Sequence, residues 1–107
     1  MDNRLGIFYS FLARSDEVDW EECLARTAAA GLDILEISAG RLRDMPLARR
    51  REIAKKARDA GLRLTFATGL PEGCDVSAKD AAQRRRGAEV LMGDVQTVAQ
   101  MGGKILA

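Results

Sequence analysis

The chain has 107 residues, of which 47% are hydrophobic and 31% charged, and its formal net charge is +1. This length favours a single domain over residues 1–107, and the composition is typical of a folded globular protein rather than a disordered or membrane-spanning one. The small net charge gives no reason to expect a nucleic-acid partner, because domains that bind nucleic acids usually carry a marked basic excess. The two arginine runs, at 49–51 and 84–86, are therefore interpreted as solvated helix faces.

The sequence contains no histidine and two cysteines. Without histidine, the most common general base and metal ligand is missing, so catalysis by this chain alone would need carboxylates or lysines. Cys23 and Cys74 are far apart and fit no metal-binding or redox spacing, so we expect both to be reduced. No apolar segment reaches the ~18 residues of a membrane helix, and no signal-peptide pattern is present, which together favour a cytoplasmic protein without a membrane partner.

A repeated phrase marks the joints between helices and strands. Residues 30–35, AGLDIL, recur thirty positions later as residues 60–65, AGLRLT, and a looser copy lies at residues 101–106. In each copy a helical pattern ends, a glycine stands where a positive φ is needed, and a short apolar segment follows. In chain order we predict a strand at 4–10, a helix at 17–30, a strand at 32–38, a helix at 46–60, a strand at 62–68, a helix at 77–101 and the start of a strand at 103–107.

Apolar residues at helical spacing predict which side of each helix is buried. The predicted sides are Trp20, Cys23, Leu24, Thr27 and Ala28 in the first helix, Ile53, Ala54, Ala57 and Ala60 in the second, and Ala81, Ala88, Leu91, Met92, Val95, Val98 and Ala99 in the third. Met92 and Met101 are expected to fill gaps in the core. Ser77 is expected to cap the third helix, with Asp80 reaching back as in a capping box.

Alternating strands and helices predict a parallel sheet, which leaves a doubly wound open sheet and a (β/α)8 barrel as alternatives. The two faces of the strands separate them, because successive side chains of a strand point to opposite faces. One face combines mainly small and polar residues, Gly6, Phe8, Ser10, Ile34, Glu36, Ser38, Thr65, Ala67 and Gly69, whereas the other carries Ile7, Tyr9, Phe11, Leu35, Ile37, Leu64 and Phe66. A doubly wound sheet needs helix-packing residues on both faces. We therefore favour a partial (β/α)8 TIM barrel of about three and a half βα units, with the first face inside.

Glu36 is a candidate functional residue, because an unpaired carboxylate in a buried strand costs several kcal/mol. It either belongs to a site at the carboxyl ends of the strands, where barrel enzymes carry their chemistry, or is locked to an internal cation or backbone donor. Phe8 either forms an apolar wall for a small ligand or fills the core. Ser10, Ser38 and residues 69–71 lie at strand ends, where the loops of binding sites begin. No glycine-rich phosphate-binding motif is present.

Several phrases match a known family: residues 6–11 (GIFYSF), 31–40 (GLDILEISAG) and 69–71 (GLP), followed by Asp75, Val76, Ser77, Asp80, Arg84 and Gly87. In this order and near this spacing, the chain resembles the N-terminal part of the D-tagatose 3-epimerase and D-allulose (psicose) 3-epimerase family, within the xylose-isomerase-like barrels. Related barrels, the hydroxypyruvate isomerases and inosose dehydratases, are an alternative. Another is a short protein that associates with a partner through its free sheet edges.

The resemblance implies a sugar isomerase that moves a proton at C3 of a free ketose with a divalent metal ion, manganese, cobalt or magnesium. In the family the metal ligands lie on later strands, so it implies no catalytic residue and no metal ligand in this chain, which alone would be inactive. It further implies that Phe8 lies near the sugar, that Ala67 lines the pocket, and that Glu36 and Ser38 line or support it. The implied partners are a small ketose and further copies in a homo-oligomer.

Two departures from the family pattern concern the sugar. Leu12 stands where the family often has tryptophan, and the region of Asp16 lacks a tryptophan that some members carry. The resemblance therefore does not identify a particular ketose.

Overall fold

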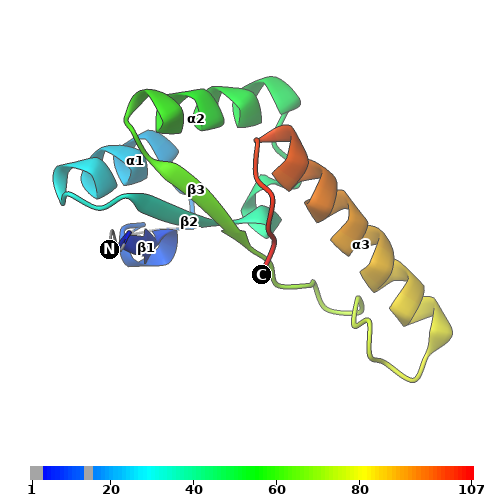
Figure 1. The fold of residues 1–107 in the computed structure, drawn as a ribbon. Coiled ribbons are helices and arrows are strands. Elements are labelled where there is room, and N and C mark those ends of the chain that lie inside the picture. Colours follow the sequence, from blue (N-terminus) through cyan, green and yellow to red (C-terminus); the bar gives the residue numbers. More distant parts are fainter. Residues whose placement is uncertain (1–3, 14–15) are drawn as a thin grey trace.

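The computed structural model describes residues 4–13 and 16–107. Within them, a parallel sheet has the order β1-β2-β3, and each strand is followed by a helix (Figure 1). The elements are β1 (Gly6–Phe8), α1 (Trp20–Ala29), β2 (Ile34–Ser38), α2 (Leu47–Asp59), β3 (Arg63–Ala67) and α3 (Ala81–Gln100). The segment after α3 adds one parallel bridge, between Phe66 and Leu106, at the position predicted for a further strand. The predicted alternation of strands and helices is thus confirmed.

The three predicted joints have one common geometry. Gly31, Gly61 and Gly102 adopt positive φ angles of 74°, 74° and 81°. In each joint the amide after the glycine donates to a carbonyl in the last turn of the preceding helix: Leu32 to Thr27 at 3.2 Å, Leu62 to Ala57 at 2.9 Å, and Gly103 to Val98 at 2.8 Å. This bond satisfies a carbonyl that the end of the helix would leave without a partner. The repeated phrase in the sequence therefore encodes a repeated helix end.

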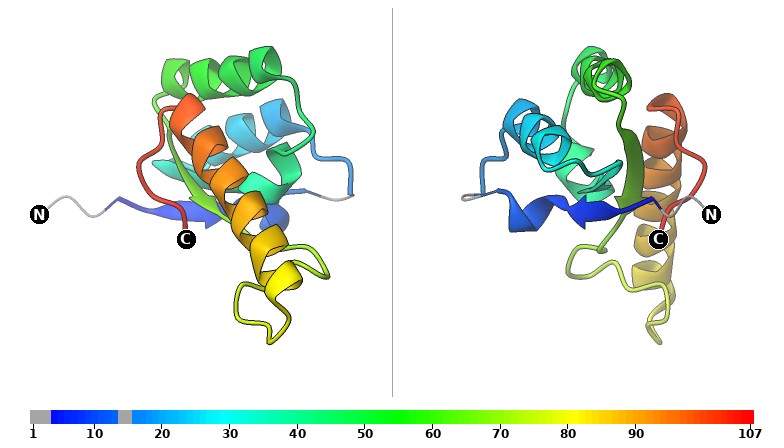
Figure 2. Two further views of the ribbon diagram at one scale, coloured as in Figure 1. Left: turned by 90° about the vertical axis from the view of Figure 1, so that its right-hand side faces the viewer. Right: turned by 60° about the vertical axis from the view of Figure 1, so that its left-hand side comes forward.

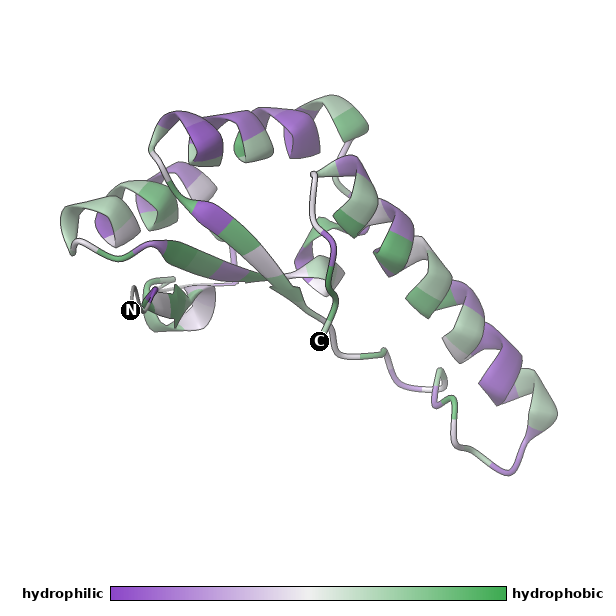
Figure 3. Cartoon of the chain, viewed as in Figure 1, coloured by the Kyte–Doolittle hydropathy of each residue, from purple (hydrophilic) through white to green (hydrophobic). Residues whose placement is uncertain are grey.

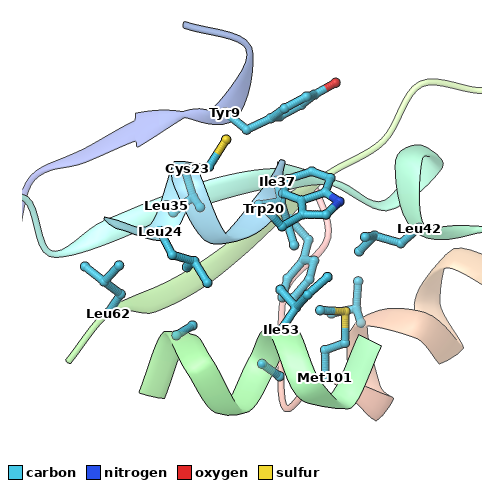
Figure 4. Close-up of a cluster of buried hydrophobic side chains, with 14 residues drawn as sticks. Tyr9, Trp20, Cys23, Leu24, Leu35, Ile37, Leu42, Ile53, Leu62 and Met101 are labelled. Atoms are coloured by element: carbon cyan, nitrogen blue, oxygen red, sulfur yellow. The ribbon is translucent and has the colours of Figure 1, made fainter. Parts of the chain in front are cut away.

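The helices bury one face of the sheet, as a barrel requires. Leu35, Ile37 and Phe66 point to that face, and each is at most 2% exposed. They pack in one hydrophobic cluster with side chains from all three helices and from the joint after α3, which include Trp20, Cys23, Leu24, Ile53, Ala57, Val98 and Met101 (Figure 4). The predicted buried sides of α1 and α2 are confirmed, apart from Ala28 and Ala60, which are exposed near the helix ends.

The first strand is shorter than predicted. The chain leaves the sheet after Phe8 and continues as a 3₁₀ helix, η1 (Tyr9–Phe11). Because this turn ends the two-residue alternation, Ser10 no longer extends the inner face and Phe11 is 79% exposed rather than covered by a helix. A second 3₁₀ helix, η2 (Ala39–Leu42), follows β2 in the same way.

The start of α3 also differs from the prediction. Asp80 is its N-cap, and its carboxylate accepts a hydrogen bond from the amide of Ala82 at 3.2 Å. Ser77 does not cap the helix. Its hydroxyl donates to Asp75 at 2.7 Å within the preceding loop, so the helix begins three residues later than this capping box would have placed it.

The buried side of α3 is more polar than predicted. Gly87, Asp94, Thr97 and Val98 are buried, whereas Met92 and Val95 are 60% and 45% exposed, so the prediction of Met92 as a core residue is wrong. The reason is that Asp94 accepts a hydrogen bond from Arg43, which follows η2, and Thr97 accepts one from Arg50 on α2. These contacts place the polar residues of α3 on its buried side. The hydropathy colouring of α3 is accordingly mixed along its length (Figure 3).

The loop before α3 and the first turns of this helix project away from the sheet (Figures 1 and 2). Cys74 is half-buried in this loop, Cys23 is buried in α1, and both are free thiols. None of the helices in the described ranges is long and apolar enough to cross a membrane.

Candidate functional site

The four site residues predicted from the sequence share one face of the sheet by register, and Phe8 also packs against the buried cluster through Tyr9. In the middle of the sheet, Phe8 pairs with Glu36, and Glu36 pairs with Thr65, so that one row crosses all three strands. Ser38 and Ala67 form the last pair in register, at the carboxyl ends of β2 and β3. All five residues are half-buried. The structure thus brings Phe8, Glu36, Ser38 and Ala67 together on the face that would line a barrel.

Glu36 has a hydroxyl neighbour rather than a charged one. The Thr65 hydroxyl donates to Oε1 of Glu36 at 3.4 Å, a long hydrogen bond. Across residues 4–13 and 16–107, no lysine or arginine forms an ion pair with Glu36, so the predicted internal cation is not found there. A carboxylate offers about four acceptor positions. Glu36 can therefore accept further hydrogen bonds from hydroxyl groups on the open side of the sheet.

The Phe8 ring packs against the ring of Tyr9, which in turn packs against Trp20. Its centroid lies 4.8 Å from that of Tyr9 in an edge-on arrangement, and Tyr9 in turn lies 5.3 Å from Trp20. Tyr9 is buried, and its hydroxyl accepts a hydrogen bond of 3.2 Å from Nε of Arg41. Edge-on aromatic packing restricts ring orientation. Phe8 therefore presents a supported apolar surface beside the carboxylate of Glu36.

A buried ionic network lies just beyond the last sheet pair, and sequence reasoning missed it. Asp94 on α3 is fully buried and accepts two hydrogen bonds from Arg43, from Nε at 2.9 Å and from Nη2 at 2.8 Å. The Thr68 hydroxyl donates to the same carboxylate at 2.6 Å. We call Arg43, Thr68 and Asp94 the Asp94 clamp. The signal in the sequence was a carboxylate between Leu91 and Val98, on what reads as an apolar helix side.

The protonation of the clamp follows from its contacts. Burial alone would raise the pKa of Asp94, but the hydrogen bonds from Arg43 and Thr68 outweigh burial, and the pKa of Asp94 is lowered. The hydrogen bond to Asp94 raises the pKa of Arg43 above its usual range. The clamp is therefore a charged pair at neutral pH, and a bidentate pair of this kind also fixes the relative orientation of its partners.

The later motif residues hold the loop between β3 and α3. A Cβ atom on Gly87 would lie 2.2 Å from the carbonyl oxygen of Cys74, so only glycine permits this close approach of loop and helix. Nη1 of Arg84 donates to the carbonyls of Ala78 and Lys79 at 2.8 Å each. The carboxylate of Asp75 accepts the hydrogen bond from the hydroxyl of Ser77. These motif residues therefore shape a loop and do not lie on the sheet face that carries Glu36.

The described residues do not fit a metal site. No group of three or more cysteine, aspartate or glutamate side chains within them is placed to hold a metal ion, and the sequence has no histidine. What the site offers is one carboxylate, hydroxyl groups and an aromatic surface. Such a set can bind and orient a polyhydroxylated molecule through hydrogen bonds and apolar contact.

Comparisons with known proteins connect this arrangement to sugar epimerases. The chain is 35% identical over 106 residues to L-ribulose 3-epimerase of Mesorhizobium japonicum, covering 97% of this chain and 34% of the relative. It is 28% identical over 96 residues to D-psicose 3-epimerase of Agrobacterium fabrum, covering 90% of this chain and 33% of the relative. A crystal structure of D-psicose 3-epimerase in the presence of D-fructose matches with a TM-score of 0.86 and 27% identity, over 94% of this chain and 35% of that one.

These matches confirm the resemblance to the ketose 3-epimerases, and the fold is that of part of their TIM barrel. The chain spans about a third of the length of the curated relatives it matches. No protein-family model matches the sequence.

Proposed function

We propose that this chain forms one side of the sugar pocket of a ketose 3-epimerase. The observation that supports the proposal is the placement of Phe8, Glu36, Ser38 and Ala67 on one half-buried face of a sheet, in a chain similar to such enzymes over nearly its whole length. Since the chain corresponds to a third of the relatives, the activity belongs to a whole barrel. The part described here contributes binding and orientation.

Each residue has a role that its chemistry allows. Glu36 accepts hydrogen bonds from sugar hydroxyls, and Ser38 both donates and accepts them. The Phe8 ring packs against the C–H surface of the sugar, and the small Ala67 side chain leaves room at the carboxyl end of β3. Positioning of this kind lowers the barrier of a reaction by holding the reacting bond in the correct geometry.

Epimerisation at C3 of a ketose removes a proton next to the carbonyl carbon and returns it to the opposite face. This step needs an acid–base pair on both sides of C3, and Glu36 is the only carboxylate of the predicted site in this chain. We therefore assign the proton transfer to residues outside the chain. A divalent metal ion, manganese, cobalt or magnesium, is likewise expected on residues outside it.

A chimera tests the proposal directly. The matching third of L-ribulose 3-epimerase from M. japonicum is replaced by this chain, and epimerisation of L-ribulose, D-psicose, D-fructose and D-tagatose is followed with manganese. We expect measurable turnover of at least one ketose. A folded chimera that epimerises none of them would contradict the proposal, and turnover only of hydroxypyruvate or an inosose would favour the related barrels instead.

Two pairs of variants in the chimera assign the roles. We expect Glu36→Gln and Phe8→Ala to lower kcat/KM by about tenfold or more, because each removes contacts with the bound sugar. The matched controls are Glu89→Gln, on an exposed position of α3, and Phe11→Ala, whose side chain is exposed and off the sheet. Equal losses in variants and controls would contradict the assigned roles.

A further inference from the structure

The Asp94 clamp joins three segments that are separate in the sequence. Arg43 follows the turn after β2, Thr68 follows β3 directly, and Asp94 lies in the middle of α3. The two hydrogen bonds from Arg43 and the one from Thr68 fill acceptor positions on both carboxylate oxygens. A buried carboxylate satisfied in this way tolerates little movement, because any displacement lengthens several charge-assisted bonds at once.

Arg43 also binds the backbone at the end of the neighbouring strand. Its Nη2 lies 3.0 Å from the carbonyl oxygen of Gly69 and 3.0 Å from the Thr68 hydroxyl, so its two N–H groups are shared among these two oxygens and Asp94. The side chain therefore joins the turn after β2 to the segment after β3. It does so directly beyond the Ser38–Ala67 pair, the last pair of the sheet register.

Stability alone is a weak explanation for such a network. Replacing a buried ion pair by well-packed apolar residues is often neutral or stabilising, so an ion pair gives no general advantage in folding free energy over an apolar contact. What the bidentate geometry adds is direction, because it permits one relative orientation of the two groups. The clamp lies next to the candidate site, where the chain continues from Ser38 into η2 and from Ala67 into Thr68.

We propose that Arg43, Thr68 and Asp94 are positioning residues for sugar binding, which hold the turn after β2 and residues 68–71 after β3 against α3 and so fix the loops that continue from Ser38 and Ala67 at the edge of the candidate site. This inference rests on the proposed function. The three residues act through the turn after β2 and through residues 68–71, without contact with the reacting atoms.

The first test uses the 107-residue chain itself. Thr68→Val removes the hydroxyl of the clamp and keeps both charges, whereas Thr68→Ser keeps the hydroxyl. We expect hydrogen exchange of the Cys74 amide, which donates to the carbonyl of Pro71 at 3.1 Å, to become about tenfold faster in Thr68→Val, as fits the loss of one hydrogen bond to a charged group. Exchange in β2 should stay unchanged, and Thr68→Ser should behave like the parent chain.

A matched control removes a comparable hydroxyl elsewhere. Thr27 is fully buried in α1, and its hydroxyl donates to the carbonyl of Cys23 at 2.7 Å. Thr27→Val should leave the exchange of the Cys74 amide unchanged relative to β2. If Thr68→Val leaves that exchange unchanged, or if it speeds exchange in β2 equally, the clamp does not position this segment and the inference is wrong.

The second test uses the chimera and separates positioning from general support of the fold. We expect Thr68→Val to raise KM about tenfold with kcat kept within about twofold, and Thr68→Ser to restore KM. An unchanged KM, a loss in kcat alone, or the same KM change in Thr27→Val would overturn the inference. If the unsubstituted chimera is inactive, the proposed function fails, and the exchange measurement still decides whether the clamp holds the segment after β3.

Discussion

The two ends of the sheet are held by different kinds of interaction. At the amino ends of β2 and β3, backbone hydrogen bonds close within a single helix-to-strand joint around Gly31 or Gly61. At the carboxyl ends, side chains from separate units pair with each other: Arg43 with Asp94, and Arg41 with Tyr9. The end that carries the candidate site is therefore the one whose geometry depends on contacts between side chains that are distant in the sequence.

The largest expected effect is at the carboxyl end, in the Asp94 clamp. Asp94→Ala removes a fully buried carboxylate and leaves Arg43, whose side chain is 25% exposed, without its carboxylate partner, which we expect to lower the free energy of unfolding by about 2 kcal/mol. Urea unfolding of the chain measures this difference. The control is Asp59→Ala, which breaks a pair with Lys55 in which the aspartate side chain is 61% exposed. That change should stay within about 0.5 kcal/mol, and equal losses at both sites would contradict the comparison.

A smaller effect is expected at the amino end. Gly61→Ala forces a residue with a Cβ atom to keep a φ of 74°, which costs about 1 kcal/mol. A Cβ atom there meets no atom within 4 Å, so the loss is purely conformational. A Cβ atom on Gly93, which lies within α3, would also meet no atom within 4 Å. Because alanine favours the helix more than glycine does, Gly93→Ala should raise the free energy of unfolding by up to about 1 kcal/mol. A lower free energy of unfolding in Gly61→Ala together with a higher one in Gly93→Ala supports the interpretation of the joint. An increase in both variants would refute it.

The smallest effect concerns the exposed ionic contact between α1 and α2. Hydrogen bonds from Arg49, followed by Lys56, lower the pKa of Glu21 to about 2. Because the folded-state pKa is depressed, this contact stabilises the fold above the ordinary pKa of glutamate, 4.5, and the contribution is lost as the pH falls toward 2. We expect Glu21→Gln to make the decline of Tm between these pH values shallower.

Salt separates this contact from the buried one. The Glu21 side chain is 37% exposed, so its attraction to Arg49 is screened and contributes less than about 1 kcal/mol. At 1 M salt the difference between Glu21→Gln and the parent chain should nearly vanish. The effect of Asp94→Ala should persist under the same conditions. A salt-insensitive Glu21 effect would show that this pair behaves as a buried one.

This division also explains what could be predicted from the sequence. The joints at Gly31, Gly61 and Gly102 depend on residues within one turn, so the repeated phrase was sufficient to predict them. The common face of Phe8, Glu36, Ser38 and Ala67 followed from the two-residue period of the strands. Their roles toward a sugar stay predictions, to be decided by the chimera.

The position of Asp94 on an apolar helix side was visible in the sequence, but its partner was not, because Arg43 and Asp94 are 51 positions apart and neither lies in a recognisable motif. Without that pairing, apolar periodicity alone decided the orientation of α3, and it placed Met92 and Val95 inside. The early end of β1 was missed for a related reason. Tyr9 and Phe11 in η1 are as apolar as the residues of a buried strand, so hydrophobicity does not mark the end of β1. In the structure, Tyr9 packs against Trp20 at the point where the chain turns.

The repeated joint has a consequence for the exchange of segments between related genes. A crossover placed at Gly31 or Gly61 falls within a hydrogen bond whose donor and acceptor are both backbone groups, so the new junction can close in any host with the same phrase. At the carboxyl end of the sheet, the contacts depend on particular side chains. A cassette that brought in α3 without the turn containing Arg43 would bury the carboxylate of Asp94 alone. Successful recombination of this fold should therefore keep residues 43 and 94 from the same parent while leaving the glycine joints free to vary in origin.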